Sequence, residues 1–385
     1  MNSILYTSNN IFYVKTDTGV DELSSEKIVK YINTSKSISR KNEWKTSGAG
    51  ARFMSTYAPE YSDEMAKRET RLNGVTGYGG EVIYSATTGE ISGLYRKGLQ
   101  KGMAEGLIMS SRDFHVFKIS AFSNNCAASF GKGLERHIAI VNIDTGSYRE
   151  LTEGEVQEDY PSYSGDGSRI YYSSAGLAIS PADIPVGIGA FGIFCYDIED
   201  NEMSELLASE KYDFIAPKED NDGNLLYIKR PYRNPFNNNI LKDIILFPVR
   251  IIRAIGGLLN YFSIVFGGES LRSGQSARDI KSKQRNEKDI FFDDNVINAE
   301  QVLKQNQRRG DKYPGIIPHS WELIRADENG NQSCLKKGVM DYTICENGDI
   351  VYSNGNAIIR LLPDGSEQLV EKCRMANNLT EMSIM

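Results

Sequence analysis

The residue types that most often carry out catalysis are sparse and widely spaced in this chain. Its three histidines, His115, His137 and His319, have neither the HxxxH nor the HExxH spacing of a metal site, so we expect each to be structural. No GxSxG segment supplies the exposed serine of a hydrolase. The sequence therefore predicts no catalytic residue and favours a protein that is not an enzyme.

A glycine-rich run imitates a dinucleotide-binding motif. Gly187, Gly189 and Gly192 spell GxGxxG, but Pro185 precedes the run and a strand-like segment, Ile193–Asp197, follows it. The motif needs a strand before it and a helix after it, because the helix N-terminus holds the pyrophosphate. We interpret the run as a loop and expect no cofactor.

Two acidic turns, Asp220–Gly223 and Asp327–Gly330, imitate calcium loops. In both, the positions of the first and twelfth ligands carry a lysine or an arginine, where calcium needs oxygen donors. We interpret both as hairpin turns and expect no metal.

A group of four acidic residues is the remaining candidate: Glu153, Glu155, Glu158 and Asp159. We expect them to form a solvated loop. The alternative is a site for a cation or a basic partner, since like charges close together raise the local negative potential.

Short β-strands must position all these residues. Within the stretch Asn142–Ser173 and just before it, His137–Asn142 and Tyr148–Leu151 flank an Asp-Thr-Gly turn, and Tyr160–Ser164 and Arg169–Ser173 flank a Gly-Asp-Gly-Ser turn. Strands of about four to six residues with connections of about two to five are typical of an antiparallel meander. We therefore predict one meander across this stretch.

Weaker copies of the meander recur along the chain. Several share an apolar strand with Tyr-Ser or Tyr-Thr-Ser near its end, a polar turn, a second apolar strand and a turn containing Gly. The copies are Ile4–Leu23, Gly80–Gly98, Phe191–Leu207, Asp222–Arg230, Trp321–Leu335 and Asp349–Leu369. A whole meander repeated about six times predicts an all-β fold, a six-bladed β-propeller. A β-sandwich with coincidentally similar turns is the alternative.

One copy carries a motif of a known family. The segment 161–174, PSYSGDGSRIYYSS, resembles the repeat of TolB-like and WD-repeat-like β-propellers, in which a Pro-x-aromatic-Ser-x-Asp-Gly turn precedes an Ile-aromatic strand. The matching residues are Pro161, Tyr163, Ser164, Asp166, Gly167, Ile170 and Tyr172. Turns in the other copies keep only the glycine and one polar residue. The resemblance implies the blade, and it implies no function.

The two ends of the chain are predicted to complete the ring. The first copy begins at Ile4–Ser8 without an inner strand, and the tail Asn378–Met385 follows the last copy. A strand from the tail would remove both open edges. We predict one β-propeller domain over residues 1–385, closed by N- and C-terminal strands. It carries an inter-blade insertion, residues 25–71, expected to be a loop with one helical turn, and a second insertion, residues 231–318, within the fifth blade.

The second insertion contains the most hydrophobic segment of the chain, Asn239–Phe266. On a helical wheel its charged residues, including Arg250 and Arg253, fall in one arc opposite an apolar face. That face comprises Ile244, Phe247, Ile251, Ile255, Leu258, Leu259, Phe262, Val265 and Phe266. We predict an amphipathic helix that contacts a membrane or a partner, and a second short helix over Val296–Arg308 that ends at Gly310.

Three locations for the amphipathic helix stay open. It caps the propeller, lies in a membrane interface with Arg250 and Arg253 near the headgroups, or docks on a partner protein. A spanning helix is disfavoured, because each arginine at mid-bilayer would cost about 2.5–3.5 kcal/mol.

The charge, the cysteines and the first residues of the chain limit the kinds of partner and cellular compartment that we expect. A net charge of −7 and a pI near 5.3 argue against a nucleic-acid partner, which needs a basic surface. The five cysteines are scattered and lack CxxC spacing, as expected for thiols in a reducing compartment. The first residues, MNSILYTSNN, lack the pattern of a secretory signal. We therefore expect a cytoplasmic protein, with peripheral membrane attachment as an extension.

These observations predict a non-enzymatic β-propeller scaffold that binds a protein partner, with membrane association through residues 239–266. The alternative is a propeller enzyme or a small-ligand-binding protein whose site lies in the central channel.

Overall fold

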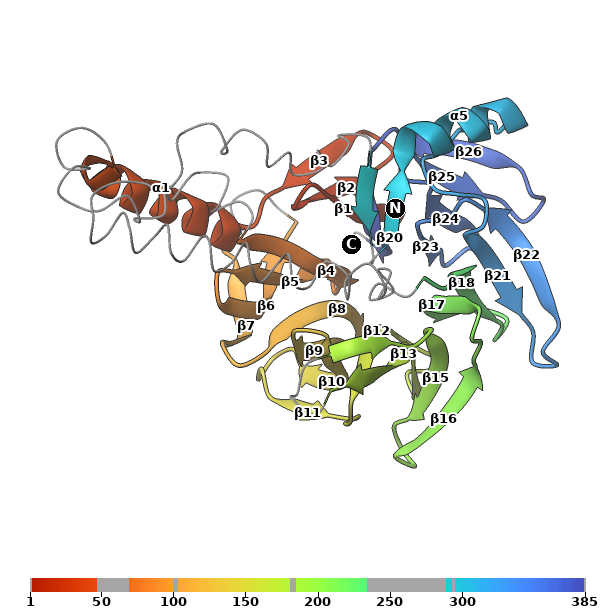
Figure 1. The fold of residues 1–385 in the computed structure, drawn as a ribbon, viewed down its shortest axis with the longest axis horizontal. Helices are drawn as coiled ribbons and strands as arrows, with labels where there is room; N and C mark the ends of the chain where they lie inside the picture. The colour runs from red at the N-terminus through yellow and green to blue at the C-terminus, as the bar shows by residue number, and fades with distance from the viewer. Residues whose placement is uncertain are drawn as a thin grey trace, which may run out of the picture.

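A computed structural model of the chain describes residues 2–46, 69–99, 103–180, 185–233, 289–292 and 295–383. Within these ranges the chain is built mainly from antiparallel strands grouped around a common centre, as Figure 1 shows. The predicted mostly-β class is confirmed.

Two sheets of four strands contain the beginning of the chain and its end. The first has the order β27 (Asn377–Ser383), β1 (Asn2–Ser8), β2 (Ile11–Lys15) and β3 (Val20–Leu23). The second consists of β4 (Thr70–Tyr78), β5 (Glu81–Thr88), β6 (Ile91–Gly98) and β7 (Gly106–Ser111).

The largest sheet has nine strands. One half consists of β8 (His115–Phe122), β9 (Asn125–Lys132), β10 (Glu135–Asn142) and β11 (Tyr148–Glu150). The other consists of β12 (Val156–Tyr163), β13 (Arg169–Ile179), β15 (Gly192–Asp197) and β16 (Glu202–Leu207), and β14 (Pro185–Ile188) extends β13. The two halves are joined by a parallel pairing of Arg136 with Gln157.

Two more four-stranded sheets follow. One consists of β17 (Tyr212–Glu219), β18 (Leu225–Pro231), β21 (Glu322–Ala326) and β22 (Gln332–Lys337). The other consists of β23 (Asp341–Ile344), β24 (Ile350–Ser353), β25 (Ile358–Leu361) and β26 (Glu367–Glu371). Between β18 and β21 the chain forms a two-stranded sheet of β19 (Asp289–Phe292) and β20 (Asn295–Asn298).

A buried tyrosine marks the same strand in five of the strand groups. Tyr6, Tyr84, Tyr172, Tyr227 and Tyr352 are each at most 2% exposed, and each lies in the strand next to the innermost one. They are the tyrosines of the repeated sequence pattern. Because a large aromatic ring fills the space between neighbouring sheets, the repeat reflects the packing of one sheet on the next.

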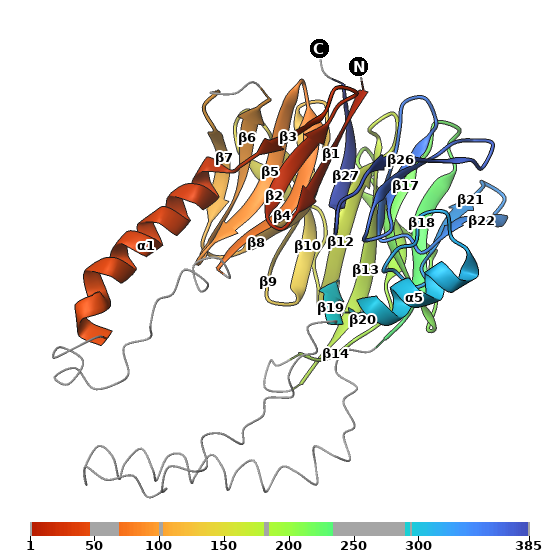
Figure 2. The ribbon, with the colours of Figure 1, turned by 90° about the horizontal axis from the view of Figure 1, so that it is seen from above.

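The head and tail of the chain pair directly. Strand β27 lies antiparallel to β1, with Asn2 opposite Ser383 and Leu5 opposite Thr380. Figure 2 shows the two termini side by side. The tail therefore supplies the strand that the first repeat lacks.

The predicted single meander across Asn142–Ser173 is wrong. Strand β11 pairs with β10, whereas β12 pairs antiparallel with β13, so the acidic segment between β11 and β12 separates two strand groups. The sequence reads as one meander because a strand that ends one group and a strand that begins the next look alike at this length.

The predicted loop with one helical turn in residues 25–71 is also wrong for its first part. Glu26–Thr46 forms the 21-residue helix α1, which extends away from the sheets in Figure 2. Its N-terminal part is held by side-chain contacts: Ser25 Oγ accepts from the Ile28 N–H at 3.1 Å and bonds to the Tyr84 hydroxyl at 2.9 Å, and the Tyr31 hydroxyl donates to Glu69 Oε2 at 2.8 Å. Residues 47–68 lie outside the described ranges.

The second predicted helix is confirmed. Helix α5 spans Ala299–Arg309, with Asn298 as N-cap and Gly310, at φ +83°, as C-cap. It begins three residues later than predicted because Asn295–Asn298 pairs with β19. The segment Asn239–Phe266 lies outside the described residues.

Candidate functional site

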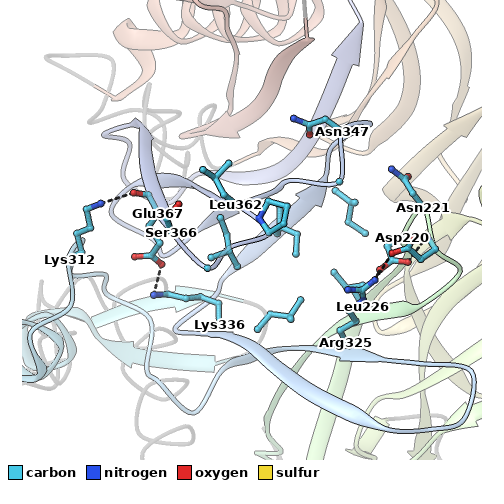
Figure 3. A pocket seen from close by; sticks show the side chains of 18 residues that line it. Asp220, Asn221, Leu226, Lys312, Arg325, Lys336, Asn347, Leu362, Ser366 and Glu367 are labelled. Atoms are coloured by element: carbon cyan, nitrogen blue, oxygen red, sulfur yellow. Dashed lines mark hydrogen bonds and ion pairs between the residues drawn. The ribbon is translucent and has the colours of Figure 1, made fainter.

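A groove of about 840 Å³ separates the sheet β17–β18–β21–β22 from the sheet β23–β24–β25–β26. Figure 3 shows it with the side chains that line it. Its floor is apolar and consists of side chains from both sheets: Leu226, Leu335, Ile344, Ile350 and Leu361. A groove of this size with an apolar floor is large enough to hold a ligand or part of a partner.

The two ends of the groove carry opposite net charge. At one end Arg325 Nη2 lies 2.8 Å from carboxylate oxygens of both Asp220 and Asp222, so two carboxylates face one guanidinium. At the other end Lys336 pairs with Glu367, and Lys312 Nζ donates to the Glu367 carbonyl at 2.7 Å. One end is therefore net negative and the other net positive, as the labelled side chains in Figure 3 show.

Polar contacts between the two sheets fix the width of the groove. Asn221 Nδ2, in the β17–β18 turn, donates to the Glu346 carbonyl at 2.9 Å, in the β23–β24 turn. The Lys336–Glu367 ion pair connects β22 with β26, and the Tyr352 hydroxyl donates to Glu367 Oε1 at 2.7 Å. The two sheets are therefore linked at both ends of the groove.

The second concave region is the central channel, a cavity of about 230 Å³ lined by residues of β4, β8, β12, β17, β23 and β27. Figure 1 shows β4, β8, β12, β17 and β23 facing the centre. Lys118 Nζ donates to Asn378 Oδ1 at 2.6 Å. Lys218 Nζ donates to the carbonyls of Tyr342 at 2.6 Å and Leu379 at 3.5 Å. Two lysine side chains therefore line the cavity, and the ammonium group of each is hydrogen-bonded to a neighbouring strand.

The environment of Lys218 shifts its protonation equilibrium. Its side chain keeps some surface open to the cavity, yet protein atoms surround it. This loss of solvation lowers the pKa of Lys218, Asp341 nearby opposes the change, and Lys118 adds to it by repulsion.

The predicted solvated loop of four acidic residues is half right. Glu153 and Glu155 are exposed in the β11–β12 connection, but Glu158 and Asp159 lie in β12 and are 3% and 7% exposed. Asp159 pairs with Arg136. Adjacent residues of a strand point to opposite faces, so both faces of β12 are covered here, and composition alone did not reveal it.

Glu158 provides a pH-dependent prediction. Burial raises the pKa of its carboxyl, although Thr152, Ser174 and the Ile138 N–H donate to it. The folded state then holds this proton more tightly than the unfolded state, so stability is lost as the pH rises past the ordinary glutamate value of about 4.3. Glu158→Gln should therefore be more stable than the wild type near pH 7 and about equal to it near pH 4.

Urea unfolding at both pH values measures this difference, and Glu155→Gln, at an exposed position, is the matched control that should change neither value. A Glu158→Gln protein that is less stable than the wild type at neutral pH would contradict the expected sign.

The other sequence candidates are dispersed. His115, His137 and His319 belong to β8, β10 and the segment before β21, and they do not converge. The GxGxxG run begins in β14, at Gly187, and ends in β15, at Gly192, so the predicted loop is confirmed only for its middle. As predicted, a strand and not a helix follows it.

Both acidic turns are hairpins, as predicted: Asp220 Oδ1 accepts from the Asn224 N–H at 2.8 Å, and Asp327 Oδ1 from the Asn331 N–H at 2.8 Å. In the described part of the chain, no group of three His, Cys, Asp or Glu residues could hold a metal ion.

The predicted contact residues of the amphipathic segment, Ile244 to Phe266 with Arg250 and Arg253, lie outside the described residues. Among the helices that are described, none is long and apolar enough to cross a membrane.

Sequence reasoning missed the groove entirely. Its charged residues come from turns and strands of two different repeats. In the sequence, four of them were considered as candidate calcium-loop positions and not as parts of one groove: Asp220, Asp222, Arg325 and Lys336. Aligning the Asp-Gly turn at Asp222 with the Asn-Gly turn at Asn347 would have placed both at the same end of neighbouring sheets.

No protein-family model matches this sequence, and no curated protein matches it. Solved structures of similar fold include TolB from Acinetobacter baumannii, at 11% identity and a TM-score of 0.52. The aligned part is 99% of this chain and 66% of the TolB chain, so this chain spans slightly less than two thirds of that protein.

Two further structures align over nearly the whole of this chain. A chain of the nidogen/laminin complex aligns at 9% identity and a TM-score of 0.48, over 100% of this chain and 99% of that one. The tricorn protease aligns at 13% identity and a TM-score of 0.45, over 99% of this chain and 34% of that one. The fold is that of a TolB-like β-propeller.

Proposed function

We propose that this protein is a non-enzymatic β-propeller scaffold that binds an extended segment of a partner protein in the groove between β22 and β26. The observation that carries the proposal is the charge pattern of the groove. Its net negative end at Asp220 and Asp222 and its net positive end at Lys312 and Lys336 flank an apolar floor. A segment with a basic end, an apolar middle and an acidic end matches this pattern in one direction only.

The scaffold that we propose is a six-bladed ring formed by one domain over residues 1–385. In this proposal the nine-stranded sheet counts as two blades, because Arg136–Gln157 is a single parallel pairing between two antiparallel groups. The β27–β1 pairing supports closure of the ring. The pairing of β18 with β21 supports an insertion, residues 231–318, within the fifth blade, and residues 25–71 form the inter-blade insertion.

We also propose a cytoplasmic location. Free cysteines that include the buried Cys126, Cys195 and Cys345 are in keeping with a reducing compartment.

Selection from a peptide library tests the groove. Peptides of about ten residues, long enough in extended form to follow a groove, are selected for binding to the full-length protein. We expect the selected peptides to share a basic end, an apolar centre and an acidic end. Leu335→Glu places a carboxylate on the apolar floor and should weaken their binding about tenfold or more, or about 1.4 kcal/mol.

Two further variants make the test specific. Asp222→Lys, at a side chain that is 79% exposed, should remove the preference for a basic end without affecting folding. Val20→Glu, at an exposed position on β3, is the control and should bind the peptides normally. The proposal fails if no peptide is enriched, or if the enriched peptides bind Leu335→Glu as well as they bind the wild type.

Membrane association through residues 239–266 is a second proposal. It rests on the two-faced pattern of that segment, with Arg250 and Arg253 opposite its apolar face. The wild type should co-sediment with vesicles that contain anionic lipid, and the protein lacking residues 239–266 should remain in the supernatant. Replacing both arginines by glutamine should weaken binding by about 1 kcal/mol each. Equal sedimentation of the deleted and wild-type proteins would rule out this attachment.

A further inference from the structure

The central channel contains a polar site that is separate from the groove. We propose that this channel binds the carboxylate group of a small organic monoacid between Lys118 and Lys218. The inference does not depend on the partner groove, because Ile344 alone is shared between the lining residues of the two cavities and these two lysines line only the channel.

The charge of the channel favours a single negative charge. Lys118, Lys218, Asp341 and Glu219 contribute two ammonium groups and two carboxylates to its lining. Glu219 lies 4.0 Å from Arg169 and accepts from the Gly165 N–H at 3.3 Å. Both oxygens of Asp341 already accept backbone N–H groups: Oδ1 from Tyr342 at 2.8 Å and Oδ2 from Leu379 at 2.9 Å. With Arg169 counted as the partner of Glu219, these groups carry one excess positive charge, which a monoanion would neutralise and a dianion would exceed.

The two ammonium groups keep hydrogen-bond donors available. A lysine ammonium carries three N–H donors. Among the described residues, Lys118 donates one hydrogen bond, to Asn378, and Lys218 donates two, to carbonyl oxygens. Three donors of the pair thus remain for a ligand, and an ionised carboxylate accepts such bonds more strongly than a neutral group does.

The backbone around the channel holds an unusual conformation. Tyr160, Ala216 and Asn378 have φ values of +58°, +55° and +52°, and all three line the cavity. Each lies where the pairing register of its strand shifts, in β12, β17 and β27. Residues held in this conformation are strained and concentrate at ligand sites. The other non-glycine residues with positive φ lie in turns.

The walls of the cavity define the rest of the ligand. A volume of about 230 Å³ limits it to a small molecule, and Val75, Ile119 and Leu379 offer apolar surface beside the lysines. We therefore expect an acid with a compact apolar body, and benzoate and propionate are suitable probes. Neutral benzamide has the shape of benzoate without its charge.

Isothermal titration calorimetry of the full-length protein at low salt tests the proposal. We expect benzoate or propionate to bind at concentrations up to about 10 mM, benzamide to bind at least about tenfold more weakly, and inorganic phosphate to bind less well than the monoacids. Lys118→Met should weaken benzoate binding about tenfold or more, whereas Lys118→Arg should preserve most of it. Lys337→Met, at a 54% exposed side chain on β22, is the control and should bind normally.

Several results would overturn the proposal. The first is equal affinity for benzoate and benzamide, a comparison that needs no variant and so does not depend on the folding of one. Unchanged affinity in folded Lys118→Met is the second, and absence of binding by every monoacid is the third. A short peptide with a free C-terminus is compared with its amidated form. Binding of the free peptide alone, without any small acid, would overturn the assignment to a small acid.

Discussion

Removal of residues 377–385 is expected to leave the protein unfolded or aggregated at room temperature. The deletion takes away β27, whose Leu379 and Met382 are 2% and 3% exposed. Burial of two such side chains contributes about 3–6 kcal/mol. That is a large part of the about 5–15 kcal/mol that stabilises a typical protein. The deletion also leaves the inner edge of β1 without a hydrogen-bonding strand, and an unpaired edge can pair with another copy of the protein and cause aggregation.

The measurement is the urea midpoint of the shortened and wild-type chains, followed by circular dichroism. A chain that lacks only residues 384–385 is the matched control, because β27 ends at Ser383, and it should unfold like the wild type. A synthetic peptide of residues 377–385 should restore part of the structure of the shortened chain. A shortened chain with the midpoint of the wild type would mean that the β27–β1 pairing contributes little.

Asp213→Ala is expected to lower the free energy of unfolding by about 3–5 kcal/mol, the range found when one partner of a buried ion pair is removed. Asp213 and Arg230 are 6% and 4% exposed, and Asp213 Oδ2 accepts from Arg230 Nε at 3.1 Å. The other carboxylate oxygen accepts from the Phe191 N–H at 3.1 Å, and the guanidinium lies 4.9 Å from the Trp321 ring. In the alanine variant, the Arg230 guanidinium and the Phe191 N–H lose the carboxylate that accepts their hydrogen bonds, and both groups stay buried.

An exposed ion pair of the same sheet is the control. Lys337 and Glu322 lie 3.1 Å apart with side chains that are 54% and 25% exposed, so Glu322→Ala should cost less than about 1 kcal/mol. The double variant Asp213→Leu with Arg230→Met should recover much of the loss, because apolar residues need no partner. A loss below about 1 kcal/mol for Asp213→Ala would show that the pair adds little to stability.

The sequence predicted the features that depend on local pattern. The strand with a Tyr near its end repeats because each ring fills the space between two sheets, and Tyr84, Tyr227 and Tyr352 all occupy it as the pattern requires. Helix α5 was predictable because Asn298 and Gly310 cap it locally. Local interactions of this kind are encoded within a few residues, so a single sequence reveals them.

Features that depend on distant contacts were not predictable. Helix α1 has a mostly polar sequence, and its first turn is fixed by Tyr84 and by Glu105, which accepts from the Glu26 and Lys27 N–H groups. The charged ends of the groove depend on ion pairs between residues that are distant in sequence, Arg325 with Asp222 and Lys336 with Glu367. The position of residues 239–266 stays a prediction.

The pairing of β27 with β1 has a consequence for synthesis in the cell. The hydrogen bond from Thr7 Oγ1 to the Asn377 carbonyl joins residues that are 370 positions apart in sequence. During translation, β1–β3 therefore keep one edge unpaired until β27, Asn377–Ser383, has left the ribosome. Sequence-distant pairing of this kind slows folding and exposes aggregation-prone edges meanwhile. We expect the nascent chain to need chaperone protection until β27 emerges.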